Sequence, residues 1–432
     1  MKRMINVGIL GLGTVGRGVL EVWERNELEI NKAVGMRVNI EKIADTDITK
    51  SHGIKLNNSK FVHDSWTVIN NPEIDVIVEA IGGIDPAKAY ILEAIKRGKN
   101  VVTSNKELVA KHGPEIFKEA IKHKVDFRFG ASVCGGVPVI SALEDVASCD
   151  RIQKIMGILN GTTNLILTEM SERRTSFRKA LKKAQQNGFA EADPRNDIEG
   201  FDTVYKLVIL SMVVFGAWVK VDSVFREGIS KITPEDIGFA KSHGYVIKLL
   251  AVAEEIDDGL GLRVHPVFLP ESHDLAQVKG VKNALFIVGV GDALEQGIEL
   301  RGPGAGGMPT GASILRDIKR IAKNIAQGAT GKSIPQLRER KFRPIEELKS
   351  RYYMRIKALD QARVLAKISD ILGNNQISIA SVVQPDELTS QGIAQIFFLT
   401  HEAEEREMQE SLKEISRLDV VKEVSNMVRV EE

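Results

Sequence analysis

The residues best suited to acid–base chemistry lie in a carboxylate-rich stretch, GFAEADPRNDIEGFDTVYKL, at positions 188–207. Its acidic side chains are Glu191, Asp193, Asp197, Glu199 and Asp202, and Lys206 follows them. Carboxylates in an irregular loop suit recognition of a substrate ammonium group, and a lysine beside them suits proton transfer at a hydroxyl. Asp202 and Lys206 stand four positions apart, so a helix places them on one face. The spacing does not fit an EF-hand calcium loop, whereas a solvated acidic loop with a helix ion pair remains the alternative.

A glycine pattern near the N-terminus predicts a dinucleotide site. Gly11, Gly13 and Gly16 follow the strand-like run VGIL and open a helical stretch. In such a loop the glycines allow a tight turn, a close approach of backbone amides to a pyrophosphate, and close packing of helix on strand. A packing turn without a ligand is the alternative.

Asp45 is the candidate for binding a ribose hydroxyl, because it ends the second predicted strand in KIADTD. It lies further from the glycines than the roughly 20 residues of the usual fingerprint. Asp47 is a second candidate, and either residue could instead be a solvated turn residue.

Lys106 follows another short strand pattern, NVVT, in the stretch TSNK. Residues just beyond the carboxyl ends of parallel strands face the ligand crevice. We therefore expect Thr103 and Lys106 near the nicotinamide and substrate, where a lysine could bind an oxygen or transfer a proton. A surface lysine that opens the helix KELVAKHG is the alternative.

Two further segments carry weaker signals. ILNGTT, which contains Thr163, has the small polar residues of a ligand-contacting loop, although a simple turn explains it equally well. ASVCGGVP could present backbone carbonyls to a cation or could be a flexible connection. The histidines have no zinc-site spacing, and Cys134 and Cys149 form no disulfide framework.

The elements that must position these residues indicate an α/β protein with a Rossmann-type parallel sheet in residues 1–130. An α+β catalytic and dimerisation domain is expected in 131–326, followed by a linker in 327–350 and a ferredoxin-like βαββαβ module in 351–432. The expected strands of the first domain are 5–10, 37–44, 76–79, 100–103 and 126–129. In the second domain, helices are expected at 203–215, 242–255 and 312–326, the last packing back on the first domain, and strands at 152–159, 262–268, 284–290 and 296–300. The module is expected to comprise strands 352–359, 377–384, 393–400 and 421–430 and helices 363–374 and 404–417.

Composition sets limits on function. The chain has 432 residues, and its 59 Lys and Arg against 58 Asp and Glu leave a formal charge of +1. Nucleic-acid binders usually show a strong basic excess, so we expect no nucleic-acid partner. No apolar run approaches the roughly 20 residues of a membrane-spanning helix. These features, with few cysteines, predict a cytoplasmic protein.

Over essentially the whole chain, the sequence resembles the homoserine dehydrogenases. The segments that carry the resemblance are GILGLGTVG, VVTSNKELVA, ASVCGGVPVI, GILNGTTNLIL, the acidic stretch ending in Lys206, YVIKLLAVAEE, RVHPVFLP and GPGAGGMPTGAS. The C-terminal segment that begins YYMRIKALDQARVLAKISDILG resembles an ACT module, a small unit that commonly binds amino acids.

The resemblance implies an NAD- or NADP-dependent enzyme that interconverts L-homoserine and L-aspartate 4-semialdehyde in threonine and methionine biosynthesis. It implies that Lys106 and Lys206 are the active-site lysines, and that Glu191, Asp197 and Asp202 serve the substrate. By the same resemblance the cofactor contacts include Gly13, Thr14, Val15, Gly302 and Gly304. It also implies a homodimer or homotetramer and threonine as an effector of the ACT module.

The sequence departs from the family pattern at three places. Gly130 stands where members often have a glutamate of a sodium site, which leaves open a bound monovalent cation at Val133, Gly135 and Val137. Ala44 replaces an arginine that would pair with a 2′-phosphate, so NAD is slightly favoured, although Lys42 or Lys50 could reach that phosphate. Ala362-Arg363 replaces the Pro-Gly common in the first loop of ACT modules. The added side chain and charge of Arg363 predict weakened or altered threonine binding, and a grip on the carboxylate of the ligand is the alternative.

Other functions are compatible with parts of the pattern. An amino-acid-sensing regulator could keep the dinucleotide fold and the ACT module without catalysis, but such a protein has no need for both lysines and the acidic loop. A dehydrogenase of a related semialdehyde would need a different substrate pocket. Aspartate-semialdehyde dehydrogenase needs a cysteine nucleophile, and Cys134 has no histidine near it in its motif.

Overall fold

The computed structural model of the chain describes residues 4–47, 49, 60–291, 294–331 and 334–431. Contacts divide the chain into two compact units, each assembled from three separate segments. Unit 1 comprises Met1–Gln153, Asp202–Ser223 and Lys282–Arg340, and unit 2 comprises Lys154–Phe201, Val224–Val281 and Lys341–Glu432. The second segment of unit 1 begins at Asp202. The helix Phe201–Val214, which carries both Asp202 and Lys206, therefore belongs with the N-terminal sheet from its second residue onward.

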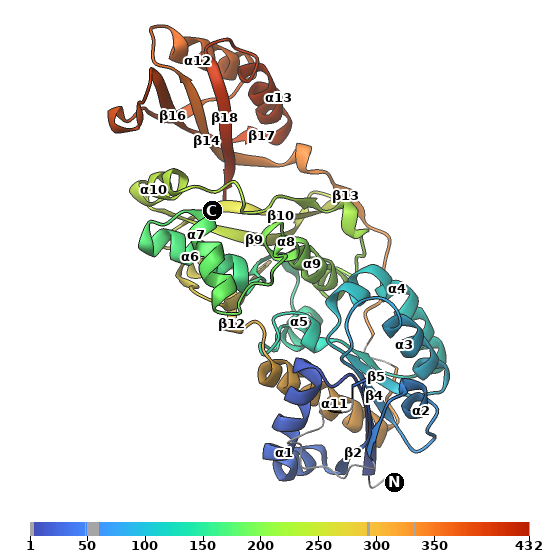
Figure 1. Cartoon of the computed structure of the whole chain (residues 1–432). Coiled ribbons are helices and arrows are strands. Elements are labelled where there is room, and N and C mark those ends of the chain that lie inside the picture. The colour runs from blue at the N-terminus through green and yellow to red at the C-terminus, as the bar shows by residue number, and fades with distance from the viewer. Residues whose placement is uncertain (1–3, 48, 50–59, 292–293, 332–333, 432) are drawn as a thin grey trace. The chain divides into compact units, whose positions relative to one another are not determined.

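Unit 1 contains the predicted Rossmann-type parallel sheet. Its strands are β1 (Met4–Leu10), β2 (Arg37–Ala44), β3 (Phe61–Val62), β4 (Val76–Glu79), β5 (Asn100–Thr103) and β6 (Phe127–Arg128), in the order β3-β2-β1-β4-β5-β6. The strand order reverses between β1 and β4, which is the switch point where such sheets bind ligands. Figure 1 shows α1 (Thr14–Val34) and α11 (Gly307–Gln327) on one side of this sheet and α2 (Ser65–Ile69), α3 (Ala87–Lys96) and α4 (Lys106–His123) on the other.

Helix α11 packs directly against α1, as the sequence predicts. Glycines make the approach so close that a Cβ on Gly18 would lie 2.0 Å from the carbonyl oxygen of Gly307, and a Cβ on Gly311 would lie 2.4 Å from the carbonyl carbon of Gly18. Unit 1 is completed by a 3-10 turn (Gly130–Ser132), α5 (Val139–Cys149), most of α9 (Phe201–Val214), a second 3-10 turn (Val221–Ser223), β11 (Lys282–Gly289) and β12 (Ile298–Pro303).

Unit 2 is built on long antiparallel strands. These are β7 (Ile152–Ile158), β9 (Tyr245–Ile256) and β10 (Gly259–Pro270), with β8 (Phe225–Arg226) beside β10 and with α6 (Gly161–Arg173), α7 (Phe177–Gln186), α8 (Arg195–Ile198) and α10 (Pro234–Ser242). The prediction of a helix over 242–255 is wrong, because α10 ends at Ser242 and Gly244 takes a φ of +77° before β9 begins. The apolar run that follows forms β9, and its central residues are buried on both faces of the sheet. Such a run is mainly apolar on both faces, so its pattern does not distinguish a helix from a strand.

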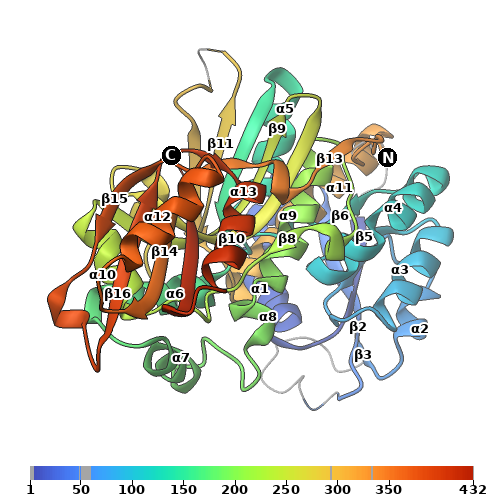
Figure 2. The ribbon, with the colours of Figure 1, turned by 90° about the horizontal axis from the view of Figure 1, so that it is seen from above.

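The C-terminal part of unit 2 has the predicted βαββαβ order. Its elements are β13 (Lys341–Arg343), β14 (Lys349–Leu359), α12 (Val364–Asn374), β15 (Ile379–Val383), β16 (Ile393–Thr400), β17 (Ala403–Glu404), α13 (Glu405–Ile415) and β18 (Val421–Val430), with 3-10 turns at Ile345–Glu347, Asp386–Leu388 and, earlier in the unit, Asp274–Gln277. Figure 2 shows α12 and α13 over one face of β14 and β16. Strand β18 pairs in parallel with β10 through Val267 and Phe268, so this sheet continues into the sheet of β9 and β10.

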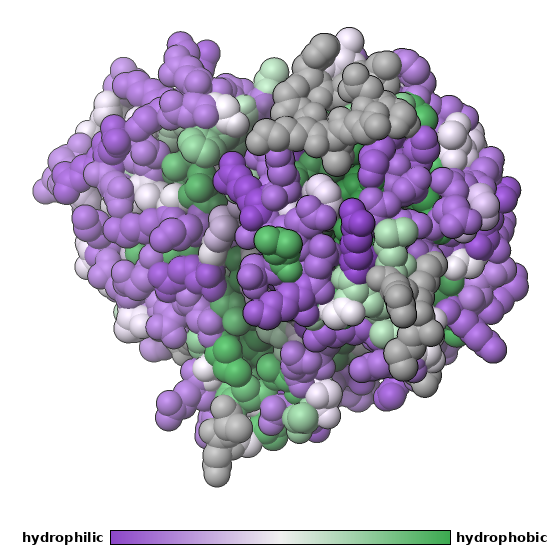
Figure 3. All heavy atoms as spheres, turned by 90° about the horizontal axis from the view of Figure 1, so that it is seen from below, coloured by the Kyte–Doolittle hydropathy of each residue, from purple (hydrophilic) through white to green (hydrophobic). Residues whose placement is uncertain are grey.

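The surface is mainly polar on the face drawn in Figure 3, where hydrophilic side chains predominate and apolar ones gather in small patches. Large apolar side chains with substantial exposure include Leu28 and Phe189. Within the part of the chain that the structure describes, no helix is both long and apolar enough to cross a bilayer.

Candidate active site

Lys106 and Lys206 share the carboxylate of Asp202 within unit 1. Lys106 Nζ lies 2.6 Å from Asp202 Oδ1, and Lys206 Nζ lies 2.7 Å from Asp202 Oδ2. The side chains of Asp202 and Lys206 are buried, whereas that of Lys106 is 40% exposed. Together the three side chains carry one excess positive charge, which favours a substrate oxygen that gains negative charge.

The electrostatics keep the Asp202 carboxylate ionised. Burial by itself raises the pKa of Asp202, but the ammonium groups of Lys206 and Lys106 outweigh it and hold this pKa well below its usual range. The carboxylate is therefore charged at neutral pH and fixes the position of both lysines. The spacing along α9 predicts the contact of Asp202 with Lys206, whereas the contact with Lys106 depends on how α9 packs beside the start of α4.

The end of β5 positions Lys106. Asn105 caps α4, and its Nδ2 donates to the carbonyl of Gly83 at 2.6 Å. Thr103 Oγ1 donates to Glu79 Oε2 at 2.6 Å and accepts from the Asn105 backbone N–H at 2.9 Å. Sequence reasoning missed the fully buried Glu79. The available signal was a carboxylate that ends the apolar strand VIVE at the ligand edge of a parallel sheet.

Cys134 contributes a neutral thiol to the same region. Burial raises its pKa to about 12, with smaller opposing effects of Lys206 and Asp202. Its backbone takes a φ of +54°, in the left-handed region. Because nucleophilic cysteines react as thiolates, this environment speaks against a Cys134 acyl intermediate.

Asp45 lies against the glycine loop. Its Oδ2 accepts from the backbone N–H of Leu12 at 2.6 Å, and its Oδ1 accepts from the N–H of Asp47 at 2.9 Å. The end of β2 therefore presents a carboxylate beside Gly11 and Gly13, as a ribose-binding residue requires. Lys50, which could reach a 2′-phosphate, lies outside the described residues.

Gly302 and Gly304 face the bend formed by residues 133–137. A Cβ on Gly302 would lie 2.9 Å from Val137 Cγ2, and a Cβ on Gly135 would lie 2.6 Å from the carbonyl oxygen of Gly304. The N–H of Gly136 donates to the carbonyl of Pro303 at 3.1 Å. These contacts join the two glycine-rich segments into one wall of unit 1.

The predicted cation ligands Val133, Gly135 and Val137 lie on that bend. Arg316 Nη2 donates at 2.8 Å to the carbonyl of Gly136, which stands between two of these residues in the sequence. Within the described chain, no group of three or more His, Cys, Asp or Glu side chains could hold a metal ion.

Asp317 of α11 explains why glycine stands at position 130. Its Oδ2 accepts from the Gly130 N–H at 2.8 Å, and a Cβ on Gly130 would lie 2.9 Å from the same oxygen. A glutamate at this position would therefore displace Asp317. Burial raises the pKa of Asp317 to about 6, against the lowering effects of Arg128 and the Gly130 N–H.

The remaining predicted substrate residues lie in unit 2. Asn160 caps α6 by accepting from the N–H of the buried Thr163 at 2.9 Å, and its Nδ2 donates to Asp197 Oδ1 at 2.7 Å. Thr162 Oγ1 donates to the carbonyl of Phe189 at 2.8 Å, which holds the start of the acidic loop on α6. Asn160, which sequence reasoning did not single out, is thus the residue that joins Thr163 to Asp197.

Glu191 and Asp193 differ from Asp197 in their surroundings. Glu191 is exposed, and only its backbone carbonyl has a described partner, Gln185. Asp193 pairs with Arg195, whose side-chain hydrogen bond holds the pKa of Asp193 down to about 2. Asp193 is therefore a local loop residue, while Glu191 keeps a carboxylate open to a ligand.

Two family models match the chain: homoserine dehydrogenase over residues 138–318, and the NAD binding domain of homoserine dehydrogenase over residues 11–130. The homoserine dehydrogenase of Bacillus subtilis is 37% identical over 433 residues, which cover 99% of each protein. The chain belongs to the homoserine dehydrogenase family. The resemblance of the sequence motifs to the homoserine dehydrogenases is confirmed.

Solved homoserine dehydrogenases share the fold. The enzyme from Thiobacillus denitrificans matches with a TM-score of 0.93 and 37% identity, covering 99% of this chain and 98% of that chain. A hyperthermophilic archaeal homoserine dehydrogenase in complex with NADPH matches with a TM-score of 0.62 and 26% identity, covering 74% of this chain and 97% of that chain. As a homoserine dehydrogenase, this chain is an NAD(P)-dependent oxidoreductase of amino-acid biosynthesis that acts on L-homoserine and L-aspartate 4-semialdehyde.

The glycine loop of this family member fits the dinucleotide. Gly11 has a φ of +96°, and a Cβ on Gly16 would lie 2.1 Å from the carbonyl oxygen of Gly11, so both positions require glycine. A Cβ on Gly13 would meet no atom within 4 Å, which leaves the loop open on the side of the α1 N-terminus. Open backbone amides at a helix N-terminus suit a pyrophosphate.

Proposed function

We propose that Lys206 is the proton donor and acceptor of the homoserine dehydrogenase reaction and that Lys106 orients the reacting oxygen. The observation that carries this proposal is the shared carboxylate of Asp202, which fixes both ammonium groups in unit 1. In the reducing direction, Lys206 gives a proton to the oxygen that was the aldehyde. In the oxidising direction, the same group takes the proton of the C4 hydroxyl.

The substrate's other end needs a partner for its α-ammonium group. We assign this role to Glu191 and Asp197, with Thr163 as a further substrate contact. The bond from Asn160 to Asp197 supports the assignment, because it fixes the carboxylate at the N-terminus of α6. Charge-assisted hydrogen bonds of this kind contribute roughly 1.5–3 kcal/mol each.

The cofactor contacts assigned to this chain are Gly11, Gly13, Thr14, Val15, Gly16, Asp45, Thr103, Lys106, Gly302 and Gly304. A bound nicotinamide would supply the acceptor of the hydride from C4 of homoserine, and its reduced form the donor. The chain's own share is to bind and orient: the open Gly13 amide region supports the pyrophosphate contact, and Asp45 beside Leu12 supports the ribose contact.

Substitution of Lys206 tests the catalytic assignment. We expect Lys206→Ala to lower kcat by about 10²–10⁴-fold, the contribution of a positioned proton-transfer group. The fold should survive, because Asp202 keeps Lys106 as its partner. The measurement is homoserine oxidation at saturating substrate, together with NADH binding by fluorescence. Lys122→Ala, an exposed lysine of α4, is the control. A loss of less than tenfold contradicts the role.

Cofactor preference follows from the end of β2. We expect a higher kcat/KM with NAD than with NADP, because Ala44 offers no guanidinium and the Asp45 carboxylate repels a 2′-phosphate. The check is homoserine oxidation with each cofactor separately. An efficiency at least tenfold higher with NADP would show that Lys42 or another cation compensates. A dependence of the rate on sodium or potassium would support the cation at Val133, Gly135 and Val137.

The predicted division into residues 1–130, 131–326, 327–350 and 351–432 is part of the proposal, with the last segment as an ACT domain. Its βαββαβ order supports this assignment. Arg363 takes a φ of +73°, so the loop that replaces Pro-Gly has a backbone that favours glycine. Threonine inhibition of the wild type and of Arg363→Gly tests the effector role. Gel filtration with light scattering tests the homodimer or homotetramer, and cell fractionation tests the cytoplasmic location.

A further inference from the structure

Residues 225–229, FREGI, lie against the end of the acidic loop within unit 2. The N–H of Ile229 donates to the carbonyl of Ile198, the last residue of α8, at 2.9 Å. A Cβ on Gly228 would lie 2.4 Å from the same carbonyl oxygen and 2.7 Å from the Cα of Glu199. The two backbones are in such close contact that position 228 requires glycine.

Arg226 makes a second contact with the same part of the loop. Its Nη1 donates to the carbonyl of Glu199, and its guanidinium carbon lies 3.6 Å from the centre of the Phe201 ring. The face of an aromatic ring attracts a guanidinium group electrostatically. Because Phe201 begins α9, residues 225–229 hold the chain from the end of α8 to the start of α9.

Glu227, between these two contacts, forms an ion pair with β18. Arg429 Nη1 donates to Glu227 Oε2 at 2.7 Å, and the guanidinium carbon lies 4.7 Å from the centre of the Phe225 ring. The backbone N–H of Glu227 donates to the carbonyl of Val264 in β10 at 2.8 Å. Residues 225–229 are thus fixed to β10 through their backbone and to β18 through two of their side chains.

Burial commits the Arg429 side chain to this arrangement. The side chain is 1% exposed, and its Nε and Nη2 donate to the two carboxylate oxygens of Glu405 at the start of α13. A buried guanidinium group needs such pairing, because its loss of water is costly. Glu405 is as deeply buried, whereas Glu227 is 38% exposed. Removal of the Glu227 carboxylate therefore leaves Arg429 with a charged partner and cuts only its connection to the loop.

We propose that Arg429 is a positioning residue for the binding of homoserine. Arg429 holds Glu227, residues 225–229 hold the end of α8, and α8 carries Asp197. Asn160 holds the Asp197 carboxylate from the side of α6, so the loop has one support at each end. The proposal rests on the substrate role assigned to Asp197. Loss of the second support loosens the loop and weakens homoserine binding, while the cofactor contacts assigned to unit 1 are unaffected.

Steady-state kinetics of Glu227→Ala in the full-length protein test the connection. We expect the KM for homoserine to rise by about fivefold or more, a typical coupling between separate positions. Because binding rather than proton transfer is weakened, kcat should stay within about twofold of the wild type, and the KM for NAD should not change. Glu227→Gln, which keeps an oxygen acceptor for Arg429 Nη1, should give a KM for homoserine between those of Glu227→Ala and the wild type.

Gly228→Ala moves the loop from the same side. Its methyl group must displace the backbone of Ile198. The KM for homoserine should rise by about tenfold or more, because misplacement by about 1 Å can cost up to about 10²-fold in an enzyme. Gly238→Ala, in α10, is the matched control, since a Cβ there would meet no atom within 4 Å. It should keep the wild-type KM.

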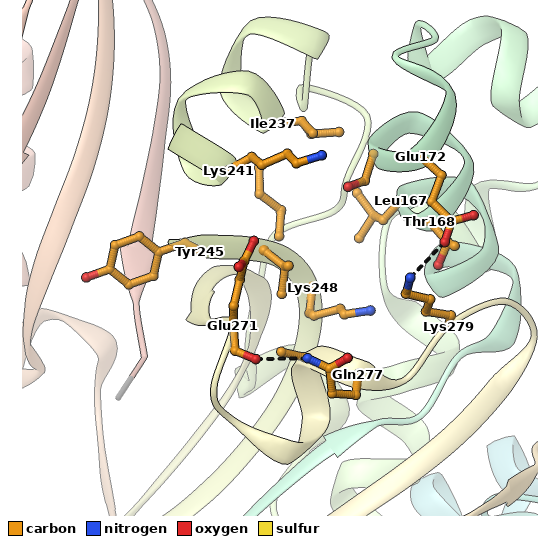
Figure 4. A pocket seen from close by; sticks show the side chains of 14 residues that line it. Leu167, Thr168, Glu172, Ile237, Lys241, Tyr245, Lys248, Glu271, Gln277 and Lys279 are labelled. Carbon is orange, nitrogen blue, oxygen red and sulfur yellow. Dashed lines mark hydrogen bonds and ion pairs between the residues drawn. The ribbon is translucent and has the colours of Figure 1, made fainter. Parts of the chain in front are cut away.

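An ion pair on α6 supplies the control for Glu227→Ala. Figure 4 shows Lys279 paired with Glu172, with 2.9 Å between Nζ and Oε1. Glu172 lies in the last turn of α6, at the opposite end from Asn160. Glu172→Ala should therefore keep the wild-type KM for homoserine. An equal rise of this KM in Glu172→Ala and Glu227→Ala overturns the proposal, because the effect would then belong to unit 2 as a whole.

Hydrogen exchange separates the position of the loop from its role toward the substrate. In Glu227→Ala the amides of residues 195–201 should exchange about fivefold faster or more, because local opening becomes easier, while those of α6 should not change. Asp197→Asn should raise the KM for homoserine without faster exchange. The positioning role is overturned by unaltered exchange in Glu227→Ala, or by an unaltered KM in that variant when Asp197→Asn raises it. An unaltered KM in Asp197→Asn contradicts the assigned substrate role of Asp197 instead.

Discussion

Two buried aspartates, one in each unit, use their carboxylates in opposite ways. Asp202 of unit 1 contacts two lysine ammonium groups and carries them as a cluster with an excess positive charge. Asp236 of unit 2 has its two oxygens surrounded by donors: Arg355 Nε at 2.8 Å, Tyr353 OH at 2.7 Å, Asn426 Nδ2 at 3.0 Å and the Thr233 N–H at 2.9 Å. The first arrangement brings two ammonium groups to one carboxylate, while the second uses every named interaction to hold secondary structures together.

The two sets of partners distinguish a candidate functional cluster, at Asp202, from a structural hydrogen-bond network, at Asp236. Asp236 completes the capping box of α10 with Thr233 and joins this helix to β14 and β18, and its surroundings leave no charge unmatched among the named groups. The Asp202 cluster has more cation than anion, and Lys106 is partly exposed. Burial of a carboxylate is thus uninformative by itself, and the balance of its partners indicates the role.

The largest expected effect on stability is at Asp236. Asp236→Ala should lower the free energy of unfolding by about 3–5 kcal/mol, because the Arg355 guanidinium is left as a buried, uncompensated charge. Denaturant unfolding of the full chain measures it. Asp222→Ala, at an exposed carboxylate of a 3-10 turn, is the control. The folded fraction should keep the wild-type KM for homoserine, and a stability within 1 kcal/mol of wild type would contradict the structural role.

Substitution of Asp202 should reverse this pattern. Asp202→Asn keeps the shape but removes the charge that orients both lysines, so kcat should fall by on the order of 10²-fold. Its cost in stability should be smaller than that of Asp236→Ala, because asparagine keeps an oxygen that can accept from Lys206 and water can still solvate the exposed part of Lys106. Steady-state kinetics and unfolding on the same preparation check both halves. Equal losses of stability in the two variants would erase the distinction between the aspartates.

The sequence predicts much of this organisation because local pattern and tertiary role coincide. The predicted bounds of β2, β4, β5, β16 and β18 are confirmed. Turn residues on either side of these β-rich runs mark where each strand starts and ends. The pairing of Asp202 with Lys206 was also accessible, because both residues lie on one helix face. Lys106 was placed at the ligand edge by its position after β5.

The features that the sequence did not predict depend on tertiary packing, which no local sequence pattern specifies. The run before Ile256 reads as a helix because it is mainly apolar, and only Gly244 signals the break that lets β9 form. The contact of Lys106 with Asp202 and the approach of Asp317 to Gly130 join residues distant in sequence. Glu79 and Asn160 looked like a strand end and a turn residue, and their roles come from the partners that the fold brings to them.

Asp317 is a third buried carboxylate, and its surroundings differ from those of both Asp202 and Asp236. It has one described backbone donor, the Gly130 N–H, and no lysine or arginine of the described chain forms an ion pair with it. Burial raises its pKa to about 6, whereas the pKa of the equally buried Asp202 is depressed by its lysines. Asp317 thus shows how burial raises the pKa of a carboxylate that has no ion-pair partner among the described residues.

The smallest expected effect is therefore a pH dependence of stability at Asp317. Its pKa is about 6 in the folded chain and about 3.9 in an unfolded one. Between these values the folded chain holds a proton that the unfolded chain has released, so stability falls as pH rises through this window and is level above it. The total change from this residue is about 2–3 kcal/mol.

The variant Asp317→Asn tests this pH dependence, because asparagine does not titrate. Its unfolding free energy should lack the fall between pH 4 and 6. The control Asp145→Asn, at an exposed carboxylate, should follow the wild type. Parallel pH profiles of wild type and Asp317→Asn would mean that Arg128 and the Gly130 N–H already stabilise the ionised form as well as water does.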